Sequence, residues 1–401
     1  MSDIFGKFDH KSGKRSSGDP LSDLAEATRL TGLGRLEEAT AIIQRTLTGR
    51  GGSHTPTPHR HGAAEPSPAL RVREVVENVV RGIAPVLKGL GHRQPAPAPE
   101  RSGGGNAGGP GAFLPRSHAV AARARDYKLF VPSSPQSPAP LVVMLHGCTQ
   151  NPDDFAAGTG MNVLAERLGL FVAYPAQSRS AHPQKCWKWY DPGDQGRETG
   201  EPAIIAGITR AIMDAYPIDP AKVYIAGMSA GGAAALNIAH AYPDLYAAVG
   251  VHSGLAAGCA RDLGSALMAM QVGAPGLGTG PSFGAPVANK RIPTIVFHGM
   301  EDNTVSVRNA DQILAQAEAA GLTASAERFE GASDRFGGHP FTRTRFTDRQ
   351  GNVVVEDWRI RGAGHAWSGG KPEGSYTDPE GPDASRAMLD FFAEHTLAKS
   401  H

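Results

Sequence analysis

Short apolar runs alternate with amphipathic stretches through most of the chain beyond residue 120. Apolar or alternating runs predict strands at 124–131, 141–145, 170–174, 222–226, 247–252, 293–298 and 353–360. Between these strands, helical segments are predicted at 161–168, 201–215, 230–241, 309–320 and 384–395. Strands that alternate with helices predict an α/β fold, with a mainly parallel sheet covered by helices on both faces.

Residues 1–115 do not continue this alternation and are predicted to form a separate N-terminal region before a domain of residues 116–401. Polar residues 1–20 are expected to be disordered, and helical patterns follow at 21–48 and 70–90. Gly- and Pro-rich linkers are predicted at 49–68 and 91–115. The apolar face of the helix 70–90 predicts docking on the rest of the chain or self-association.

The pentapeptide Gly227-Met228-Ser229-Ala230-Gly231 lies between a predicted strand and a predicted helix. In that setting, a G-x-S-x-G sequence is typical of a nucleophile elbow, which holds the serine at the helix N-terminus with its hydroxyl exposed. The two glycines allow the sharp turn, because a Cβ at either position would collide with the neighbouring strand or helix. Ser229 is therefore the candidate nucleophile.

A serine hydroxyl needs a base to take its proton, and that base is oriented by an acid. In α/β-hydrolases the order along the chain is serine, acid, histidine. Asp302 follows the strand 293–298 and His365 follows the strand 353–360, so both fit this order. Glu301 is the rival acid and His339 the rival base. Each of these residues has the alternative of a plain turn or loop position.

The loop after the strand 141–145 begins His146-Gly147-Cys148. In the α/β-hydrolase fold, an N–H from the loop after an early strand binds the oxyanion together with the N–H of the residue after the nucleophile. The amides of Cys148 and Ala230 are therefore the candidate oxyanion hole. The alternative for His146-Gly147 is a plain strand end.

The chain resembles the polyhydroxybutyrate depolymerase family of esterases, which are α/β-hydrolases with feruloyl and acetylxylan esterase relatives. The resemblance rests on residues 145–150, 186–190, 200–207, 225–232, 249–254, 298–305 and 364–370. It covers about residues 119–396, and its Cys-Trp-x-Trp and Gly-His-Ala-Trp sequences are not general to α/β-hydrolases. One departure is Met300, where the acid loop of the family often has a further aspartate.

The resemblance implies a serine esterase with Ser229 as nucleophile, Asp302 as acid, His365 as base and the Cys148 amide in the oxyanion hole. It implies poly- or oligo-3-hydroxybutyrate-type esters as substrate, with feruloyl or acetylxylan esters as the alternative. A peptidase of the same fold would use the same triad and would cleave peptide amides. A non-catalytic protein that coats granules or serves as an interaction platform would instead have a broken triad.

Three cysteines are too few for a disulfide framework. Cys148 and Cys186 lie in loops expected at the rim of the site, where they can form a disulfide or stay as two buried thiols. The resemblance implies that the two are close. Cys259 fits a small core or turn position.

Trp187, Trp189 and Trp367 lie in or beside the motif loops and are candidate substrate-binding residues, with core packing as the alternative. The segment 261–290 interrupts the alternation of strands and helices. It is helix-like to residue 271 and Gly- and Pro-rich beyond it, which predicts a mobile flap over the pocket or a plain surface insertion.

The charge balance, with 40 Lys and Arg against 39 Asp and Glu, leaves no basic excess for nucleic-acid binding. No metal-ligand cluster, phosphate loop or dinucleotide fingerprint is present in the sequence, so we expect no metal or cofactor and an ester substrate as the partner.

No apolar run is long enough for a transmembrane segment. The N-terminus lacks the basic-then-apolar pattern of a secretory signal, so the expected location is cytoplasmic. Exported family relatives make an extracellular location the alternative. Polyester granule association through the N-terminal region is a further hypothesis, and the mixed charge of the helix 70–90 disfavours a membrane surface.

Overall fold

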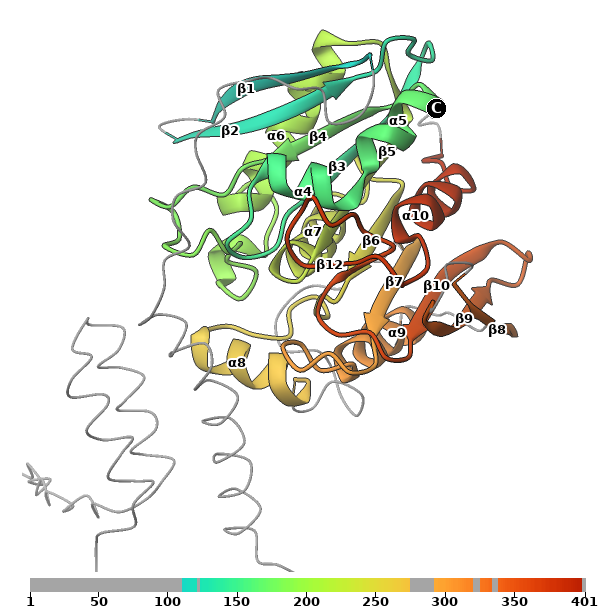
Figure 1. Ribbon diagram of the computed structural model, residues 1–401. Coiled ribbons are helices and arrows are strands. Elements are labelled where there is room, and N and C mark those ends of the chain that lie inside the picture. Colours follow the sequence, from blue (N-terminus) through green and yellow to red (C-terminus); the bar gives the residue numbers. More distant parts are fainter. Residues whose placement is uncertain (1–109, 121–122, 275–291, 320–324, 334–337, 399–401) are drawn as a thin grey trace, which may run out of the picture. The chain divides into compact units, whose positions relative to one another are not determined.

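The computed structural model describes residues 110–120, 123–274, 292–319, 325–333 and 338–398. In this part of the chain the main sheet has ten strands, in the order β1-β2-β4-β3-β5-β6-β7-β10-β9-β8 (Figure 1). The strands are β1 (Ala112–Val120), β2 (Arg123–Val131), β3 (Ala139–Leu145), β4 (Phe171–Pro175), β5 (Ile218–Met228), β6 (Ala248–His252), β7 (Thr294–Gly299), β8 (Ser325–Ala332), β9 (Pro340–Thr347) and β10 (Val353–Ile360). The helices are α4 (Pro152–Thr159), α5 (Met161–Leu168), α6 (Gly200–Ala215), α7 (Ala230–Ala241), α8 (Leu263–Val272), α9 (Arg308–Ala319) and α10 (Ala384–Ala393).

The centre of the sheet, from β4 through β3, β5, β6 and β7 to β10, is parallel. Antiparallel pairs flank this centre, with β2 and β1 on one side and β9 and β8 on the other. The carboxyl ends of the parallel strands share one edge of the sheet, so the loops that leave them meet there. This arrangement confirms the predicted mainly parallel α/β fold.

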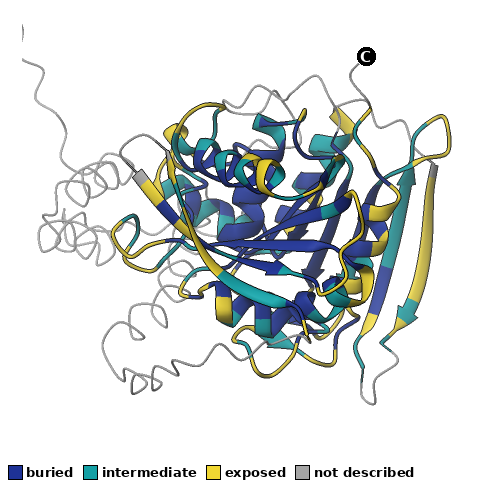
Figure 2. Cartoon of the chain, turned by 90° about the horizontal axis from the view of Figure 1, so that it is seen from above, coloured by how far each residue is buried: buried dark blue, intermediate teal, exposed yellow. Residues whose placement is uncertain are grey.

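Helices cover both faces of the sheet and bury its central strands (Figure 2). In β3, Leu141, Val143 and Leu145 belong to one hydrophobic core, and Val142 and Met144 belong to the other. Helices α6, α7, α8 and α9 contribute to the first core, and α4, α5 and α10 contribute to the second. Burial on both faces explains why β3 is a continuous apolar run in the sequence.

Several elements of the structure were not predicted. Strand β1 begins at Ala112, inside the predicted linker 91–115, and pairs with β2 along its whole length. The linker prediction is therefore wrong at its end. Helix α4 begins with Pro152 after Asn151, whose side chain accepts the N–H groups of Asp153 and Asp154. Strands β8 and β9 form an antiparallel hairpin that extends the sheet beyond β10.

The helix-like first part of the segment 261–290 is α8, and its N-terminus is capped by Asp262. Residues 275–290 of the predicted flap lie outside the described residues, as do the predicted helices at 21–48 and 70–90 and the proposed granule-binding region. No helix in the described part of the chain is long and apolar enough to cross a membrane.

Candidate active site

Ser229 forms the turn between β5 and α7 and has the backbone angles φ 56° and ψ −123°. Two close approaches explain the glycines around it. A Cβ on Gly231 would lie 2.1 Å from the carbonyl oxygen of Leu145, and one on Gly227 would lie 2.4 Å from the carbonyl carbon of Gly231. The elbow therefore fits against the end of β3 only without these side chains. Positive φ at a non-glycine residue is strained, and such strain is concentrated at functional sites.

Asp302 and His365 are in direct contact at the carboxyl edge of the sheet. The Nδ1 of His365 lies 2.7 Å from Oδ2 of Asp302. The other carboxylate oxygen, Oδ1, accepts the N–H groups of Thr304 (2.9 Å) and Val305 (2.8 Å). Those two amides fix the carboxylate, so its remaining oxygen is directed at the imidazole.

The environment of Asp302 favours its ionised form. Burial alone would raise the pKa of this carboxyl group. The hydrogen bond and charge of His365, together with the Val305 amide, outweigh burial and hold the pKa of Asp302 below its ordinary value. An ionised carboxylate only accepts hydrogen bonds, so Nδ1 of His365 must carry the proton between them.

The rival acid and the rival base have other contacts. Glu301 is exposed, and its carboxylate accepts the N–H of Gly362 (2.6 Å), in the loop before His365. His339 Nε2 lies 3.3 Å from Oδ2 of Asp378. The structure thus pairs His365 with Asp302. No hydrogen bond among the described residues joins Ser229 to His365, and their roles as nucleophile and base stay predictions.

The loop after β3 lies against the elbow. A Cβ on Gly147 would be 3.7 Å from Cβ of Ser229, and the Gly147 amide is held by Oε1 of Gln150 (2.9 Å). Among the described residues, nothing accepts a hydrogen bond from the amide of Cys148. Ala230 is the first residue of α7, where helix amides lack intrahelical acceptors. Both predicted oxyanion donors are therefore available for an oxyanion.

The sequence model of the family described as "Esterase PHB depolymerase" matches residues 125–337. The chain belongs to this family. The matched stretch holds Ser229 and Asp302 and ends before His365. Poly(3-hydroxyalkanoate) depolymerase C of Paucimonas lemoignei is 32% identical over 244 residues, which are 59% of this chain and 56% of that protein. Feruloyl esterase B of Thermothelomyces thermophilus is 30% identical over 199 residues, which are 47% of this chain and 67% of that protein.

The chain thus spans little more than half of the length of depolymerase C, at 56%. Among solved structures, that of an acetyl xylan esterase from Aspergillus awamori covers 70% of this chain and 99% of its own, with a TM-score of 0.53 and 18% identity. At that identity the likeness concerns the fold alone, and the fold is the α/β-hydrolase fold of esterases.

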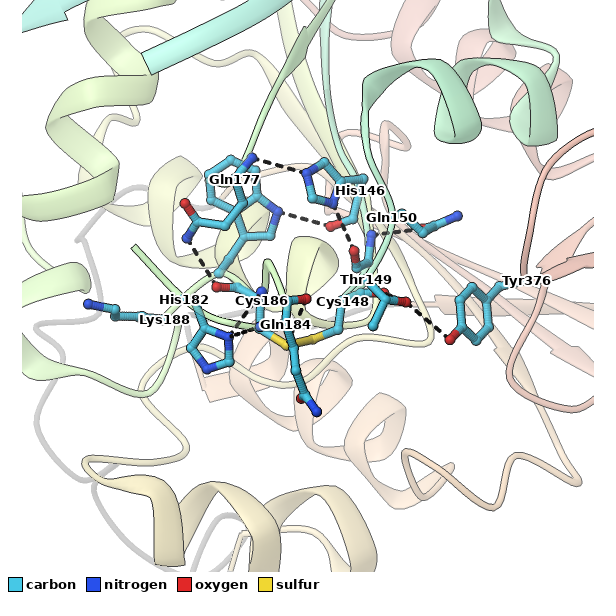
Figure 3. The surroundings of a disulfide bond; sticks show 12 residues. His146, Cys148, Thr149, Gln150, Gln177, His182, Gln184, Cys186, Lys188 and Tyr376 are labelled. Carbon is cyan, nitrogen blue, oxygen red and sulfur yellow. Dashed lines mark hydrogen bonds between the residues drawn. A yellow bond between two sulfur atoms is a disulfide. The ribbon is translucent and has the colours of Figure 1, made fainter. Parts of the chain in front are cut away.

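In this esterase-family chain, a disulfide joins Cys148 to Cys186 across 38 residues of sequence (Figure 3). The amide of Thr149 also donates to the carbonyl of Gln184 (2.6 Å), so the disulfide and this hydrogen bond both join the loop after β3 to the segment around Cys186. Of the two outcomes that the sequence left open for these cysteines, the structure has the bonded one. Cys259 is free and buried.

A buried polar network supports the Cys186 segment. The Gln177 side chain donates to the carbonyl of Cys186 (3.0 Å) and to the carboxylate of Glu201. The other oxygen of Glu201 accepts the amide of Lys188 (2.9 Å). Burial, followed by the charge of Asp194, raises the pKa of Glu201 to about 7. The sequence does not predict this network, because its partners lie 9 to 24 residues apart and meet only when the loops that carry them fold together.

The three candidate tryptophans are buried, with exposed fractions of 0% for Trp187, 5% for Trp189 and 1% for Trp367. The indole N–H of Trp187 donates to the carbonyl of His146 (2.9 Å), and that of Trp367 donates to Ser385 (3.0 Å). Packing accounts for all three in this structure. Their contact with substrate stays a prediction.

An exposed aromatic residue that the sequence analysis did not single out lies beside the loop after β3. The hydroxyl of Tyr376 lies 3.2 Å from that of Thr149 (Figure 3). Both residues have positive φ, 53° for Tyr376 and 68° for Thr149. Tyr376 is thus an accessible aromatic side chain at the rim of the site. It lies 227 residues after its contact Thr149 in the sequence, so local pattern does not indicate it.

Proposed function

We propose that the chain is a serine esterase that hydrolyses carboxylic esters through an acyl-enzyme on Ser229. The observation that carries this proposal is the 2.7 Å contact between His365 Nδ1 and Asp302 Oδ2, on loops at the same sheet edge as the elbow. With its proton on Nδ1, the imidazole has an unprotonated Nε2 that can accept the proton of the serine hydroxyl.

The proposed reaction has two halves. Oγ of Ser229 attacks the ester carbonyl carbon while Nε2 of His365 takes the hydroxyl proton. The amides of Cys148 and Ala230 bind the resulting oxyanion, and one such donor contributes about 2.7–4 kcal/mol in comparable sites. His365 then gives its proton to the leaving alcohol as the C–O bond breaks. In the second half, His365 deprotonates a water molecule, which attacks the acyl-enzyme, releases the acid and restores Ser229.

As the natural substrate we propose poly- or oligo-3-hydroxybutyrate-type polyesters. The similarity to depolymerase C, which extends over more of this chain than that to feruloyl esterase B, supports this choice. Feruloyl or acetylxylan esters are the second candidate, supported by the likeness to feruloyl esterase B.

The disulfide between Cys148 and Cys186 bears on the location of the chain. Disulfides persist in oxidising environments and are rare in the reducing cytosol. The bond therefore supports the extracellular alternative over the cytoplasmic expectation.

Hydrolysis of p-nitrophenyl butyrate and of 3-hydroxybutyrate oligomers tests the proposal, with wild type and Ser229→Ala measured in parallel. We expect the wild type to turn over both and the variant to turn over neither. Cleavage of the nitrophenyl ester alone would keep the mechanism and move the natural substrate to feruloyl or acetyl esters. Activity that survives in Ser229→Ala would refute the mechanism.

A further inference from the structure

His252, the last residue of β6, is hydrogen-bonded to two of the segments that carry the proposed triad. Its backbone carbonyl accepts the N–H of Ser229 (2.9 Å). Its ring Nε2 accepts the N–H of Ser368 (2.9 Å), in the short segment that follows His365. His252 thus binds the turn at Ser229 (the nucleophile turn) through its backbone, and residues 365–368 (the base segment) through its side chain.

The ring of His252 also packs against the strand that leads to the acid. It stacks on Phe297 of β7, with ring centroids 5.8 Å apart, and on Trp367 at 4.9 Å. In the sheet, His252 pairs with Met228 on one side and with Phe297 on the other. Its side chain is fully buried, so these contacts leave it a single position.

The chemistry of the ring suits a fixed, uncharged acceptor. Because Nε2 accepts an amide proton, the ring proton lies on Nδ1, which is 3.2 Å from Oγ of Ser253. Burial, followed by the charges of His298 and His365, lowers the pKa of His252 to about 3, so the ring stays neutral at ordinary pH. An apolar side chain here would leave the buried Ser368 amide without an acceptor, which is unfavourable.

We propose that His252 is a positioning residue that sets the distance between the nucleophile turn and the base segment. This inference rests on the proposed function. The hydrogen bonds from Ser229 and Ser368 end on the same residue, so a displacement of its ring moves His365 relative to Ser229. Misplacement of reacting groups by about 1 Å lowers turnover about 100-fold.

Two substitutions separate positioning from packing. His252→Phe keeps an aromatic ring for stacking and removes the acceptor, whereas His252→Gln places an amide oxygen near the position of Nε2. We expect His252→Phe to lower kcat for p-nitrophenyl butyrate about 100-fold, with KM little changed. We expect His252→Gln to recover most of that loss even if its Tm is no higher than that of His252→Phe.

His395→Phe is the matched control. His395 is also a buried histidine, packed on Phe391 with ring centroids 4.3 Å apart, and it lies after α10. This substitution should lower Tm and leave kcat unchanged. A wild-type kcat in folded His252→Phe would overturn the inference, as would a loss that His252→Gln does not reverse.

The labelling rate of Ser229 by an alkyl phosphonofluoridate, followed by mass spectrometry, is a second readout that needs no ester turnover. We expect His252→Phe to be labelled about 100-fold more slowly than wild type, with recovery in His252→Gln. Equal rates would overturn the inference. A wild type that is labelled but cleaves no ester would contradict the proposed function alone. Absence of labelling in the wild type would overturn both.

Discussion

The substitution Asp302→Asn exchanges one carboxylate oxygen for an amide nitrogen and keeps the shape of the side chain. The oxygen that accepts the amides of Thr304 and Val305 can stay in place, because an asparagine oxygen accepts the same bonds. The new amide group then faces Nδ1 of His365, where the 2.7 Å contact now lies. An amide donor requires an unprotonated Nδ1, so the ring proton moves to Nε2 and the proposed base can no longer accept the serine proton.

The size of the effect follows from this change of tautomer. The corresponding exchange in a well-studied serine protease lowers kcat about 10⁴-fold. At about 1.4 kcal/mol for each factor of ten, transition-state stabilisation falls by about 5–6 kcal/mol. The loss of one charge-assisted hydrogen bond costs the fold less, about 1.5–3 kcal/mol. Activity should therefore fall far more than stability.

The assay is kcat for p-nitrophenyl butyrate together with the urea midpoint of unfolding. Glu301→Gln is the matched control, because it makes the same chemical change one position away. Within the described part of the chain, the Glu301 carboxylate accepts only the amide of Gly362. We expect the control to keep kcat within a factor of a few. A large loss in Glu301→Gln, with activity kept in Asp302→Asn, would refute the assignment of the acid.

Three further predictions concern the glycines, the disulfide and a buried carboxyl group. Gly231→Ala places a Cβ 2.1 Å from the Leu145 carbonyl oxygen and should lower both turnover and the unfolding free energy, the latter by about 1–3 kcal/mol. Gly364→Ala, whose Cβ meets nothing within 4 Å, should lower neither quantity in the same ester and thermal-unfolding assays. Equal losses of turnover and stability in the two variants would contradict the reasoning. Loss of the disulfide in a Cys148→Ser, Cys186→Ser double variant should lower the unfolding free energy by about 4 kcal/mol, from the loop entropy of a 38-residue separation. An unchanged urea midpoint in the double variant would contradict this prediction. Burial, and then the charge of Asp194, raises the pKa of Glu201 from 4.5 to about 7, so its stabilisation is complete below pH 4.5 and is lost as pH rises through 7. Between pH 4.5 and about 7, the unfolding free energy of the wild type minus that of Glu201→Gln should fall by about 1.4 kcal/mol per pH unit. Unfolding free energies of the two proteins that run parallel over this pH range would contradict the prediction.

The sequence predicted the elements and site residues that depend on local pattern. The elbow was readable because strand, turn and helix are contiguous and the required glycines flank Ser229. Helices α5 and α7 have the predicted bounds. The elbow sets the beginning of α7, and a run of small residues follows it. Asp302 and His365 were singled out because their order and their strand-end positions follow from the parallel topology.

Features that depend on distant partners were not predicted. Nothing near His252 in the sequence indicates that its ring accepts an amide 116 residues away. The contact of Tyr376 with Thr149 likewise depends on how two loops meet. Strand β1 was missed because its beginning follows a Gly- and Pro-rich stretch, and its pairing with β2 decides its conformation.

Direct observation of the acyl-enzyme tests the central claim. The wild type is mixed with p-nitrophenyl butyrate, quenched in acid during the first turnovers, digested and analysed by mass spectrometry. The account predicts a butyryl group on Ser229. A butyryl group on another residue, or ester turnover without any acylated Ser229 under these conditions, would contradict it.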